Sequence, residues 1–446
     1  MGKLFGTDGI RGVANRHPIT SDMGLKLGKA IARFIGNKRP YVVVGRDTRL
    51  SGQMLEYALG AGLMAEGSNV WAAGIIPTPG LAYLTRELGA DAGVVLSASH
   101  NPFQHNGFKV FSSQGTKLTE EEELELERLI SEANDRDTSA RDVGTLTEVP
   151  DATDRYVRFL SGCFEGYNNL NNLKVVLDCA NGASYLAGPM LFQQLGAKVI
   201  PIAVKPNGSN INEDCGSQHP ERLTQKVVET GAHVGFAFDG DGDRVVAVDE
   251  KGHVLTGDQL IAILAKMLKE QGKLDNNTVV STVMSNMGLK VALENMGIEH
   301  VTTQVGDRNV YQEMITRGSV LGGEDSGHII LLRHHSTGDG MLSALQVLVA
   351  MEYFGKPLSE LGRFMEVYPQ VLLNVDVSSK PPLSEIPDVE QRIRKIKDEL
   401  GRSGRVLVRY SGTENVCRIM VEGENETKIR KFAEEIAEAL RRAIDQ

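Results

Sequence analysis

The sequence predicts an α/β protein of several domains, and three observations support that prediction. Expected strands alternate with amphipathic helices along residues 41–354, a pattern typical of βαβ units and mainly parallel sheets. The chain has 446 residues, enough for three or four domains of ordinary size. From about residue 365 the pattern changes to alternating strands joined by short turns, which indicates a separate α+β domain.

The elements of the first half follow this pattern in order. The apolar run 92–96 predicts a buried parallel strand, because such strands are covered on both faces. The first unit has further strands at 41–44 and 69–73, helices ending near 65 and 88, a Glu-rich helix from 120 and a polar linker at 134–150. The second unit has strands at 173–178, 198–204, 234–238 and 245–248, and helices at 184–195 and 221–230.

The second half contains a third unit of the same style and then the changed pattern. The third unit has helices at 258–269, from 289, from 308 and at 339–354, and strands at 279–283, 299–304, 319–321 and 329–332. The last unit has strands at 371–377, 406–409 and 416–421, and helices at 389–400 and 426–444. We therefore expect domains at 1–150, 151–252, 253–364 and 365–446.

Composition excludes several classes of protein. The net charge is −10 with no block of basic residues, which argues against a nucleic-acid partner. The four cysteines are widely spaced without a Cys-x-x-Cys pair, so neither a disulfide framework nor a zinc knuckle is expected. No apolar run resembles a signal core or a membrane span, so we expect a cytoplasmic protein without a membrane partner.

A polar loop follows the predicted strand 92–96. It places Ser99 and His100 at the carboxyl end of that strand, and Lys109 follows shortly after. Ligands of open α/β sheets bind at this edge, so a nucleophilic hydroxyl beside an imidazole and a cation indicates a candidate active site. An ordinary polar turn is the alternative for this loop taken alone.

The string Asp-Gly-Asp-Gly-Asp-Arg at residues 239–244 is the sharpest single signal. The carboxylates of Asp239, Asp241 and Asp243 can converge on one hard cation, Mg²⁺ or Ca²⁺. An EF-hand loop also begins Asp-x-Asp-x-Asp, and Glu250 falls at its twelfth position. However, Arg244 stands where that loop needs glycine, and both flanks are predicted strands, so the EF-hand is disfavoured.

Four further loops carry weaker signals. Residues 322–328 place Glu324, Ser326 and His328 between glycines, where they could bind sugar hydroxyls and exchange protons. Residues 409–415, with Arg418, form a candidate phosphate nest, for which a plain hairpin turn is the alternative. Arg11 and Arg46 each lie in a glycine-rich loop and could bind phosphate or form a surface ion pair. Together with the seryl hydroxyl and the acidic string, these loops favour phosphoryl transfer through a phosphoserine.

Four motifs in this order and spacing resemble the α-D-phosphohexomutase family over essentially the whole chain. They are Ser-His-Asn-Pro at 99–102, the acidic string, Gly-Glu-Asp-Ser-Gly-His at 323–328 and Arg-Tyr-Ser-Gly-Thr-Glu at 409–414. The last motif and Phe-Gly-Thr-Asp-Gly-Ile-Arg-Gly at 5–12 favour the glucosamine branch of the family. Asp325 and Asn415 depart from the Gln and Pro expected in that branch.

The resemblance implies a four-domain, heart-shaped enzyme, with three mixed α/β sandwich domains and a C-terminal α+β domain around a central cleft. It implies that Ser99 is the phosphoserine and, with Asp239, Asp241 and Asp243, binds one Mg²⁺. Sugar hydroxyls would bind Glu324 and Ser326. The non-transferred phosphate would bind Arg409, Ser411, Gly412, Thr413 and Arg418. The transferring phosphate and its proton would be supported by Arg11, Lys109, Arg244 and His328, with His100 orienting the loop.

The resemblance also implies a reaction. A hexose 6-phosphate and its 1-phosphate would interconvert through a 1,6-bisphosphate, which primes the enzyme, so the expected partner is a small phosphosugar. A homodimer is a candidate assembly. Phosphoglucomutase or phosphomannomutase activity, a phosphatase, and a Ca²⁺-binding module without catalysis stay open as alternatives.

Overall fold

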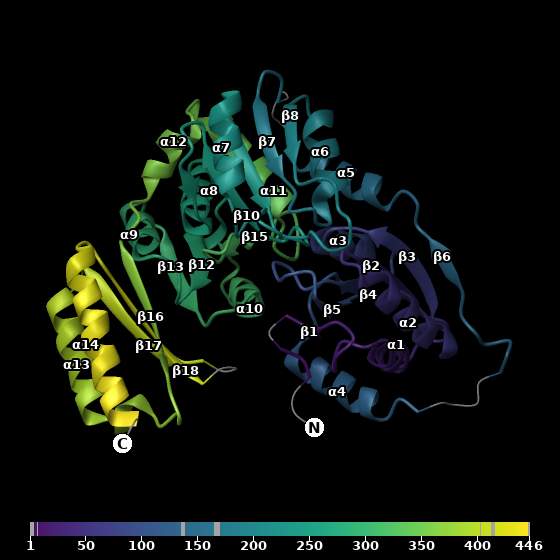
Figure 1. Ribbon diagram of the computed structural model, residues 1–446. Coiled ribbons are helices and arrows are strands. Elements are labelled where there is room, and N and C mark those ends of the chain that lie inside the picture. The colour runs from purple at the N-terminus through teal and green to yellow at the C-terminus, as the bar shows by residue number, and fades with distance from the viewer. Residues whose placement is uncertain are drawn as a thin grey trace. The chain divides into compact units, whose positions relative to one another are not determined.

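A computed structural model describes residues 4–6, 8–134, 139–164, 170–401, 403–411 and 415–444. The chain forms two compact units, the first containing residues 1–284 and 298–364 and the second containing 285–297 and 365–446. The first unit holds three mixed sheets and the second holds one antiparallel sheet (Figure 1). This confirms the predicted fold class of three α/β domains followed by an α+β domain.

The first sheet has six strands with helices on both faces. Its strand order is β1 (Ile10–Val13), β5 (His105–Ser112), β4 (Ala92–Leu96), β2 (Tyr41–Arg46), β3 (Asn69–Ile75) and β6 (Leu146–Glu148). The helices are α1 (Ser21–Ile35), α2 (Gly52–Ala65), α3 (Thr78–Glu87) and α4 (Glu120–Ser131). Strand β6 lies in the segment predicted as a linker, and β1, β5 and α1 were not predicted.

Side chains that point alternately to opposite faces of the central strands explain why helices cover both faces of the first sheet. Val42 and Val44 of β2 belong to one apolar core with residues of α1, α2 and α4. Gly45, on the opposite face of the same strand, lies against Leu81 of α3. Because successive side chains of a strand point to opposite faces, the near-continuous apolar runs predicted from the sequence are buried on both sides.

The second and third sheets repeat this plan. The second has the order β11 (Val254–Leu255), β10 (Val245–Asp249), β9 (Val234–Phe238), β7 (Lys174–Asp178) and β8 (Lys198–Ile202), with α5 (Ala152–Gly162), α6 (Ser184–Gln194) and α7 (Glu221–Thr230). The third has the order β13 (Glu299–Thr303), β12 (Thr278–Thr282), β14 (Leu321–Gly323) and β15 (Ile329–Leu331), with α8 (Gly257–Glu270), α10 (Asp307–Arg317), α11 (Gly340–Phe354) and α12 (Leu358–Leu361). In each sheet, parallel central strands are extended by an antiparallel strand.

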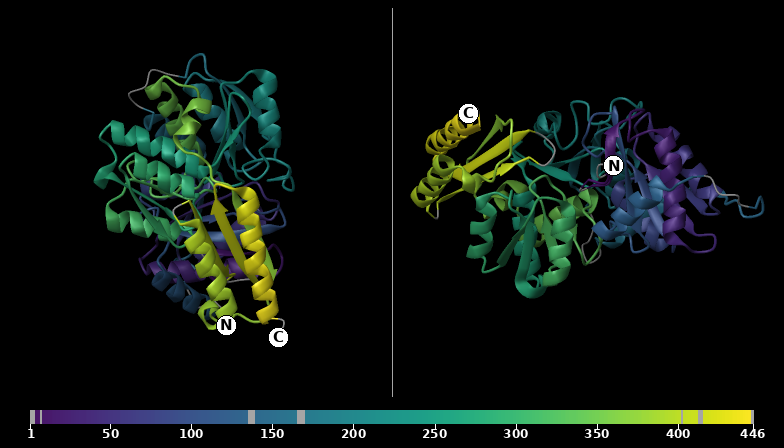
Figure 2. Two further views of the ribbon diagram at one scale, coloured as in Figure 1. Left: turned by 90° about the vertical axis from the view of Figure 1, so that its left-hand side faces the viewer. Right: turned by 90° about the horizontal axis from the view of Figure 1, so that it is seen from below.

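The second unit is a three-stranded antiparallel sheet covered by helices. Its order is β16 (Gln370–Asp376), β18 (Val416–Gly423) and β17 (Gly404–Tyr410), with α9 (Met287–Asn295), α13 (Pro387–Leu400) and α14 (Glu426–Ile444). Figure 2 shows α13 and α14 side by side on one face of this sheet. Their apolar stripes form a core with alternate residues of the strands.

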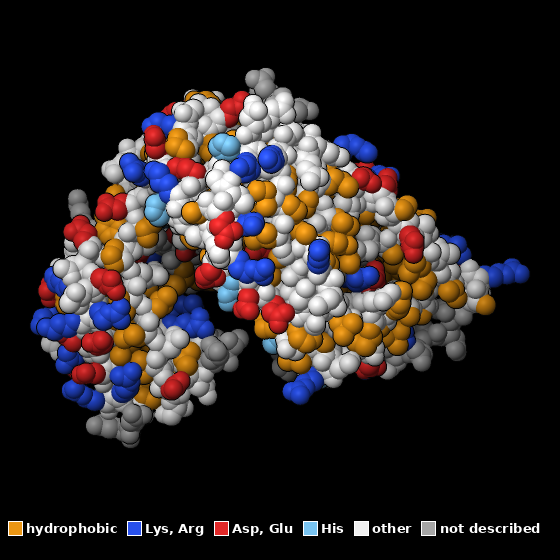
Figure 3. Space-filling view, turned by 45° about the horizontal axis from the view of Figure 1, so that its top comes forward, with side chains coloured by type: hydrophobic (Ala, Val, Ile, Leu, Met, Phe, Trp, Pro, Cys, Tyr) orange, Lys and Arg blue, Asp and Glu red, His pale blue; other side chains and the backbone are white. Residues whose placement is uncertain are grey.

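None of the helices in the described part of the chain is both long and apolar enough to cross a bilayer. Acidic and basic side chains are interspersed over the face shown in Figure 3, and neither sign gathers into one patch on that face.

Candidate active site

Three predicted motifs occupy the same topological position in the three sheets of the first unit. The Ser99 loop joins β4 to β5, residues 239–244 join β9 to β10, and residues 324–328 join β14 to β15. In each case the loop connects a strand that pairs in parallel with one neighbour to an antiparallel strand. All three loops therefore leave the carboxyl ends of parallel strands, where ligands of α/β sheets bind.

Ser99 is buried and aimed at the acidic string. Its hydroxyl donates a hydrogen bond to Oδ2 of Asp239 at 2.6 Å. Its backbone has φ of 52°, a left-handed conformation that is uncommon for a residue other than glycine. Gly240 makes this approach possible, because a Cβ there would lie 2.6 Å from the carbonyl oxygen of Ser99.

His100 lies beside the Ser99 hydroxyl, with Nδ1 at 3.4 Å from Oγ. Burial, together with the positive charges of Arg244 and Arg11, lowers the pKa of His100 to about 4. The imidazole is therefore neutral near pH 7 in this setting. One of its ring nitrogens donates a hydrogen bond and the other accepts one.

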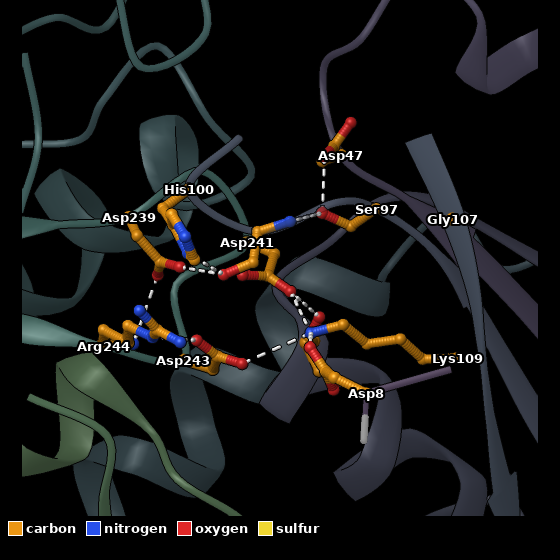
Figure 4. Close-up of polar contacts among 12 residues, drawn as sticks. Asp8, Asp47, Ser97, His100, Gly107, Lys109, Asp239, Asp241, Asp243 and Arg244 are labelled. Atoms are coloured by element: carbon orange, nitrogen blue, oxygen red, sulfur yellow. Dashed lines mark hydrogen bonds and ion pairs between the residues drawn. The ribbon is translucent and has the colours of Figure 1, made fainter. Parts of the chain in front are cut away.

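The three aspartates form a buried cluster whose chemistry suits a hard cation (Figure 4). One carboxylate oxygen of each aspartate lies within 4.8 Å of one oxygen of each of the other two. Burial and the charges of Asp243 and Asp241 raise the pKa of Asp239 well above its ordinary value. Oδ1 of Asp241 and Oδ1 of Asp243 are buried and accept no hydrogen bond from any described residue. A divalent cation would pair with these oxygens and relieve the repulsion, so the residues fit Mg²⁺.

Lys109 extends into the same cluster from β5. Its ammonium lies 2.8 Å from Asp241, 3.0 Å from Asp8 and 3.4 Å from Asp243 (Figure 4). Burial alone would lower the pKa of Lys109, but these carboxylates outweigh burial and raise it above the ordinary value. Lys109 therefore stays positively charged among the carboxylates of Asp8, Asp241 and Asp243.

The two predicted arginines flank this cluster. Arg244 donates its backbone N–H to Asp239 at 3.2 Å, and its Nε lies 3.9 Å from Asp243. Arg11 forms an ion pair with Asp8, the same carboxylate that binds Lys109. The structure thus brings Arg11 and Arg244 to the cluster that also holds Ser99.

A line of alternating charges connects this cluster to the third loop. Asp8 forms an ion pair with Lys117, and Lys117 forms one with Asp307. Oδ2 of Asp307 lies 3.7 Å from Nε2 of the buried His328. The predicted proton-exchanging histidine is therefore connected to Lys109 through side chains that the sequence analysis did not select.

The other residues of the third loop are also engaged. Oε1 of Glu324 accepts the backbone N–H of Gly306 at 3.1 Å. Oγ of Ser326 is buried and has no hydrogen-bond partner among the described residues. The backbone carbonyl of the unexpected Asp325 accepts the N–H of Gly257 at 3.0 Å, and its Oδ1 accepts the N–H of Asp258, at the start of α8, at 3.4 Å. Its side chain thus contacts a helix N-terminus, where negative charge is favourable.

The predicted phosphate residues lie in the second unit. Arg409 of β17 and Arg418 of β18 are directly opposite each other in the antiparallel ladder. Ser411 donates its N–H to the carbonyl of Val416 at 2.9 Å, and its own carbonyl accepts from Lys380 at 2.8 Å. A phosphate between two arginines would form charge-assisted hydrogen bonds with both guanidinium groups. Gly412 and Thr413 lie outside the described residues.

Sequence reasoning missed several residues of the first-unit site. Thr78 donates to Asp241 at 2.6 Å, and Lys117 and Asp307 are isolated charges without a recognisable pattern. Asp8 lies inside the quoted motif 5–12 and could have been selected from it. Arg46, considered for phosphate, forms an ion pair with Glu56 at 2.8 Å instead.

Comparison with known proteins identifies the family of this chain. Models of phosphoglucomutase/phosphomannomutase α/β/α domains I, II and III match residues 2–137, 154–252 and 256–368, and the C-terminal domain model matches 372–439. A phosphoglucosamine mutase of Syntrophus aciditrophicus is 52% identical over 448 residues, covering 100% of both chains. One of Syntrophotalea carbinolica is 51% identical, covering 99% of this chain and 98% of its own.

Solved structures share the fold. A phosphoglucomutase/phosphomannomutase family protein of Burkholderia thailandensis has a TM-score of 0.82 at 24% identity, covering 99% of this chain and 97% of its own. N-acetylphosphoglucosamine mutase of Aspergillus fumigatus, in complex with GlcNAc-6P and magnesium, has a TM-score of 0.67 at 16% identity, covering 99% and 96%. The family matches confirm the resemblance drawn from the four motifs. The chain therefore belongs to the phosphoglucomutase/phosphomannomutase family of phosphohexomutases.

Proposed function

We propose that this enzyme interconverts glucosamine 6-phosphate and glucosamine 1-phosphate through a phosphorylated Ser99. The observation that carries the chemistry is the 2.6 Å hydrogen bond from the Ser99 hydroxyl to Asp239, which places a nucleophile against a buried acidic cluster. The choice of amino sugar is supported by full-length relatives at about half identity that are named phosphoglucosamine mutase.

The proposed reaction has two phosphoryl transfers. In the first, O1 of glucosamine 6-phosphate forms a bond to phosphorus as the bond to Ser99 Oγ breaks, and the O1 proton passes to the protein. In the second, the bond between O6 and phosphorus breaks as the bond to Ser99 Oγ forms again, and O6 takes up a proton. The 1,6-bisphosphate turns over within the site between these transfers.

The chain's own residues support these steps in distinct ways. Asp239, Asp241 and Asp243 would hold one Mg²⁺ with the seryl phosphate, and the cation would neutralise charge on the transferring group. Lys109, Arg11 and Arg244 would add positive charge at the same point. His328 would exchange the proton, and His100, neutral near pH 7, would orient the loop.

Binding of the substrate would use the remaining predicted residues. Glu324 and Ser326 would bind sugar hydroxyls, for which the buried Ser326 Oγ has no other described partner. The phosphate that is not transferred would bind Arg409, Ser411, Gly412, Thr413 and Arg418. The magnesium complex of the Aspergillus protein supports the choice of metal. A cytoplasmic location and a homodimer stay predictions.

The test combines kinetics with detection of the phosphoserine. We expect the highest kcat/KM on glucosamine 6-phosphate among the glucosamine, glucose and mannose phosphates, and intact-mass and ³¹P signals of a phosphoseryl protein during turnover. Ser99→Ala should abolish turnover, whereas Ser131→Ala, on the exposed end of α4, should not.

A preference for glucose or mannose phosphates would indicate the alternative mutases, and release of inorganic phosphate would indicate a phosphatase. Tight Ca²⁺ binding without a phosphoserine would indicate the non-enzymatic module.

A further inference from the structure

Arg49 lies fully buried beneath the Ser99 loop, and its whole guanidinium is used there. Nε donates to Asp47 at 2.8 Å. The two terminal nitrogens donate to four backbone carbonyls of the loop, those of Ser99 and Asn101 at 2.8 Å, Pro102 at 2.5 Å and His105 at 3.1 Å. Four of the five N–H groups of the side chain can thus be accounted for by contacts with this loop, and the fifth by Asp47.

Asp47, which accepts from Arg49, is also connected to the backbone N–H of Ser99. The N–H of Ser99 donates to Oγ of Ser97 at 3.0 Å, and that hydroxyl donates to Asp47 at 2.6 Å (Figure 4). Ser99 is therefore held at its N–H through Asp47 and at its carbonyl through Arg49. A left-handed residue that is not glycine persists only where its surroundings determine it strongly, and these contacts provide that constraint.

We propose that Arg49 and Asp47 are positioning residues for phosphoryl transfer. They hold the backbone of Ser99 so that its Oγ points at Asp239, and they touch neither substrate nor metal in this role. This inference rests on the proposed function, because the backbone constraint matters for transfer only if Ser99 carries the phosphoryl group. Transfer requires in-line geometry, and a displacement of about 1 Å at a reacting atom can slow an enzyme by about 100-fold.

Arg49→Lys tests the proposal directly, because an ammonium keeps the charge but cannot reach five acceptors. We expect kcat to fall by about 30-fold or more while KM for the sugar phosphate changes by less than about twofold. The single-turnover rate of Ser99 phosphorylation by glucose 1,6-bisphosphate should fall equally. In that step a sugar O–P bond breaks, the Ser99 Oγ–P bond forms, and the seryl proton goes to the sugar oxygen.

Arg33→Lys is the matched control. Arg33 is also buried in the first sheet's domain, where it pairs with Glu66 at 2.5 Å and donates to the carbonyls of Glu132 and Asn134. It contacts no part of the Ser99 loop in these interactions, so its loss should lower stability and leave both rates unchanged. All measurements are made at a temperature where each variant is folded.

Ser97→Ala keeps the proposal testable if Arg49→Lys does not fold. It removes one hydroxyl between Asp47 and the Ser99 N–H, and we expect about a tenfold loss of kcat without a change in KM. In the double variant the losses should be less than multiplicative, since both substitutions act on one peptide. Unchanged kcat in Arg49→Lys, or in Ser97→Ala where the former is unfolded, would overturn the inference, as would an equal loss in Arg33→Lys. If Ser99→Ala itself stays active, the proposed function fails instead.

Discussion

The ammonium group of Lys117 forms an ion pair with the carboxylate of Asp307, 190 residues further along the chain. It also pairs with Asp8, so one cation joins the domain of the first sheet to that of the third. The three side chains are only 13–22% exposed. Burial alone would lower the pKa of Lys117, but Asp307 and Asp8 outweigh it and raise that pKa.

Lys117→Met should therefore destabilise the first unit by about 3 kcal/mol, because two largely buried carboxylates lose their counter-charge. Urea unfolding measures this loss. Lys26→Met is the control, since Lys26 and Asp22 form an exposed pair with side chains 44% and 71% exposed. That substitution should change stability by less than about 1 kcal/mol. Equal effects of the two substitutions would show that the bridge between the domains contributes nothing special.

Mg²⁺ should stabilise the wild-type protein against thermal unfolding and should not stabilise Asp239→Asn. A ligand present at about 100 times its Kd adds about 2.7 kcal/mol to a folded state that alone binds it. The variant loses a carboxylate from the cluster and also loses charge repulsion, so its stability without the cation should equal or exceed that of the wild type. Thermal denaturation of chelator-treated protein during a Mg²⁺ titration measures both effects.

Asp249→Asn provides the control for this experiment. Asp249 is another buried aspartate, at the far end of β10, and it accepts from the backbone of Lys251 and His253. Its replacement should lower stability while the Mg²⁺-dependent increase persists. A Mg²⁺ effect that survives in Asp239→Asn would remove Asp239 from the proposed metal site.

The sequence predicted the parts of the site that are encoded locally. Ser99 and the three aspartates follow apolar strands directly. Because ligands of α/β sheets bind at the carboxyl ends of parallel strands, this position was enough to predict that these residues lie at a ligand site. The pairing of Lys117 with Asp307 could not be predicted, because neither residue has a local pattern and their proximity depends on the packing of two domains. Arg49 was missed because its role depends on carbonyls about 50 residues away.

The same distinction applies to the secondary structure. Helix α14 and strand β4 have strong amphipathic or apolar patterns and lie where they were predicted. Strand β6 has three exposed residues and exists through its pairing with β3, so no hydrophobic period marks it. Because that period is absent, the sequence predicts a linker for the whole Asn134–Pro150 segment.

His335 should weaken the fold in mild acid. Its Nδ1 accepts the N–H of Ser336 and its Nε2 lies 2.8 Å from the carbonyl of Pro79, an arrangement that suits the neutral ring. Burial lowers the pKa of His335 from 6.5 to about 4, with the Pro79 contact partly opposing it. Between these values the unfolded chain binds the proton and the folded chain does not, so stability falls as pH decreases from 6.5 towards 4, by up to about 3 kcal/mol.

His335→Gln tests this, because glutamine can still donate to Pro79 but does not titrate. Unfolding free energies of both proteins between pH 7 and pH 4 should converge as the pH falls, since only the wild type carries this penalty. Other groups titrate in the same range, but they are common to both proteins and cancel in the difference. Parallel pH profiles would contradict the prediction.

Arg409→Gln should weaken substrate binding without slowing the chemistry. Arg409 lies opposite Arg418 in the ladder of the second unit, and a phosphate between them would make charge-assisted hydrogen bonds. Loss of one such bond costs about 1.5–3 kcal/mol, so KM for the sugar phosphate should rise by about 10-fold to 100-fold with kcat little changed. Arg394→Gln, which removes an exposed pair with Glu390 on α13, should leave KM unchanged. A variant with normal KM would show that Arg409 does not bind the phosphate of the substrate.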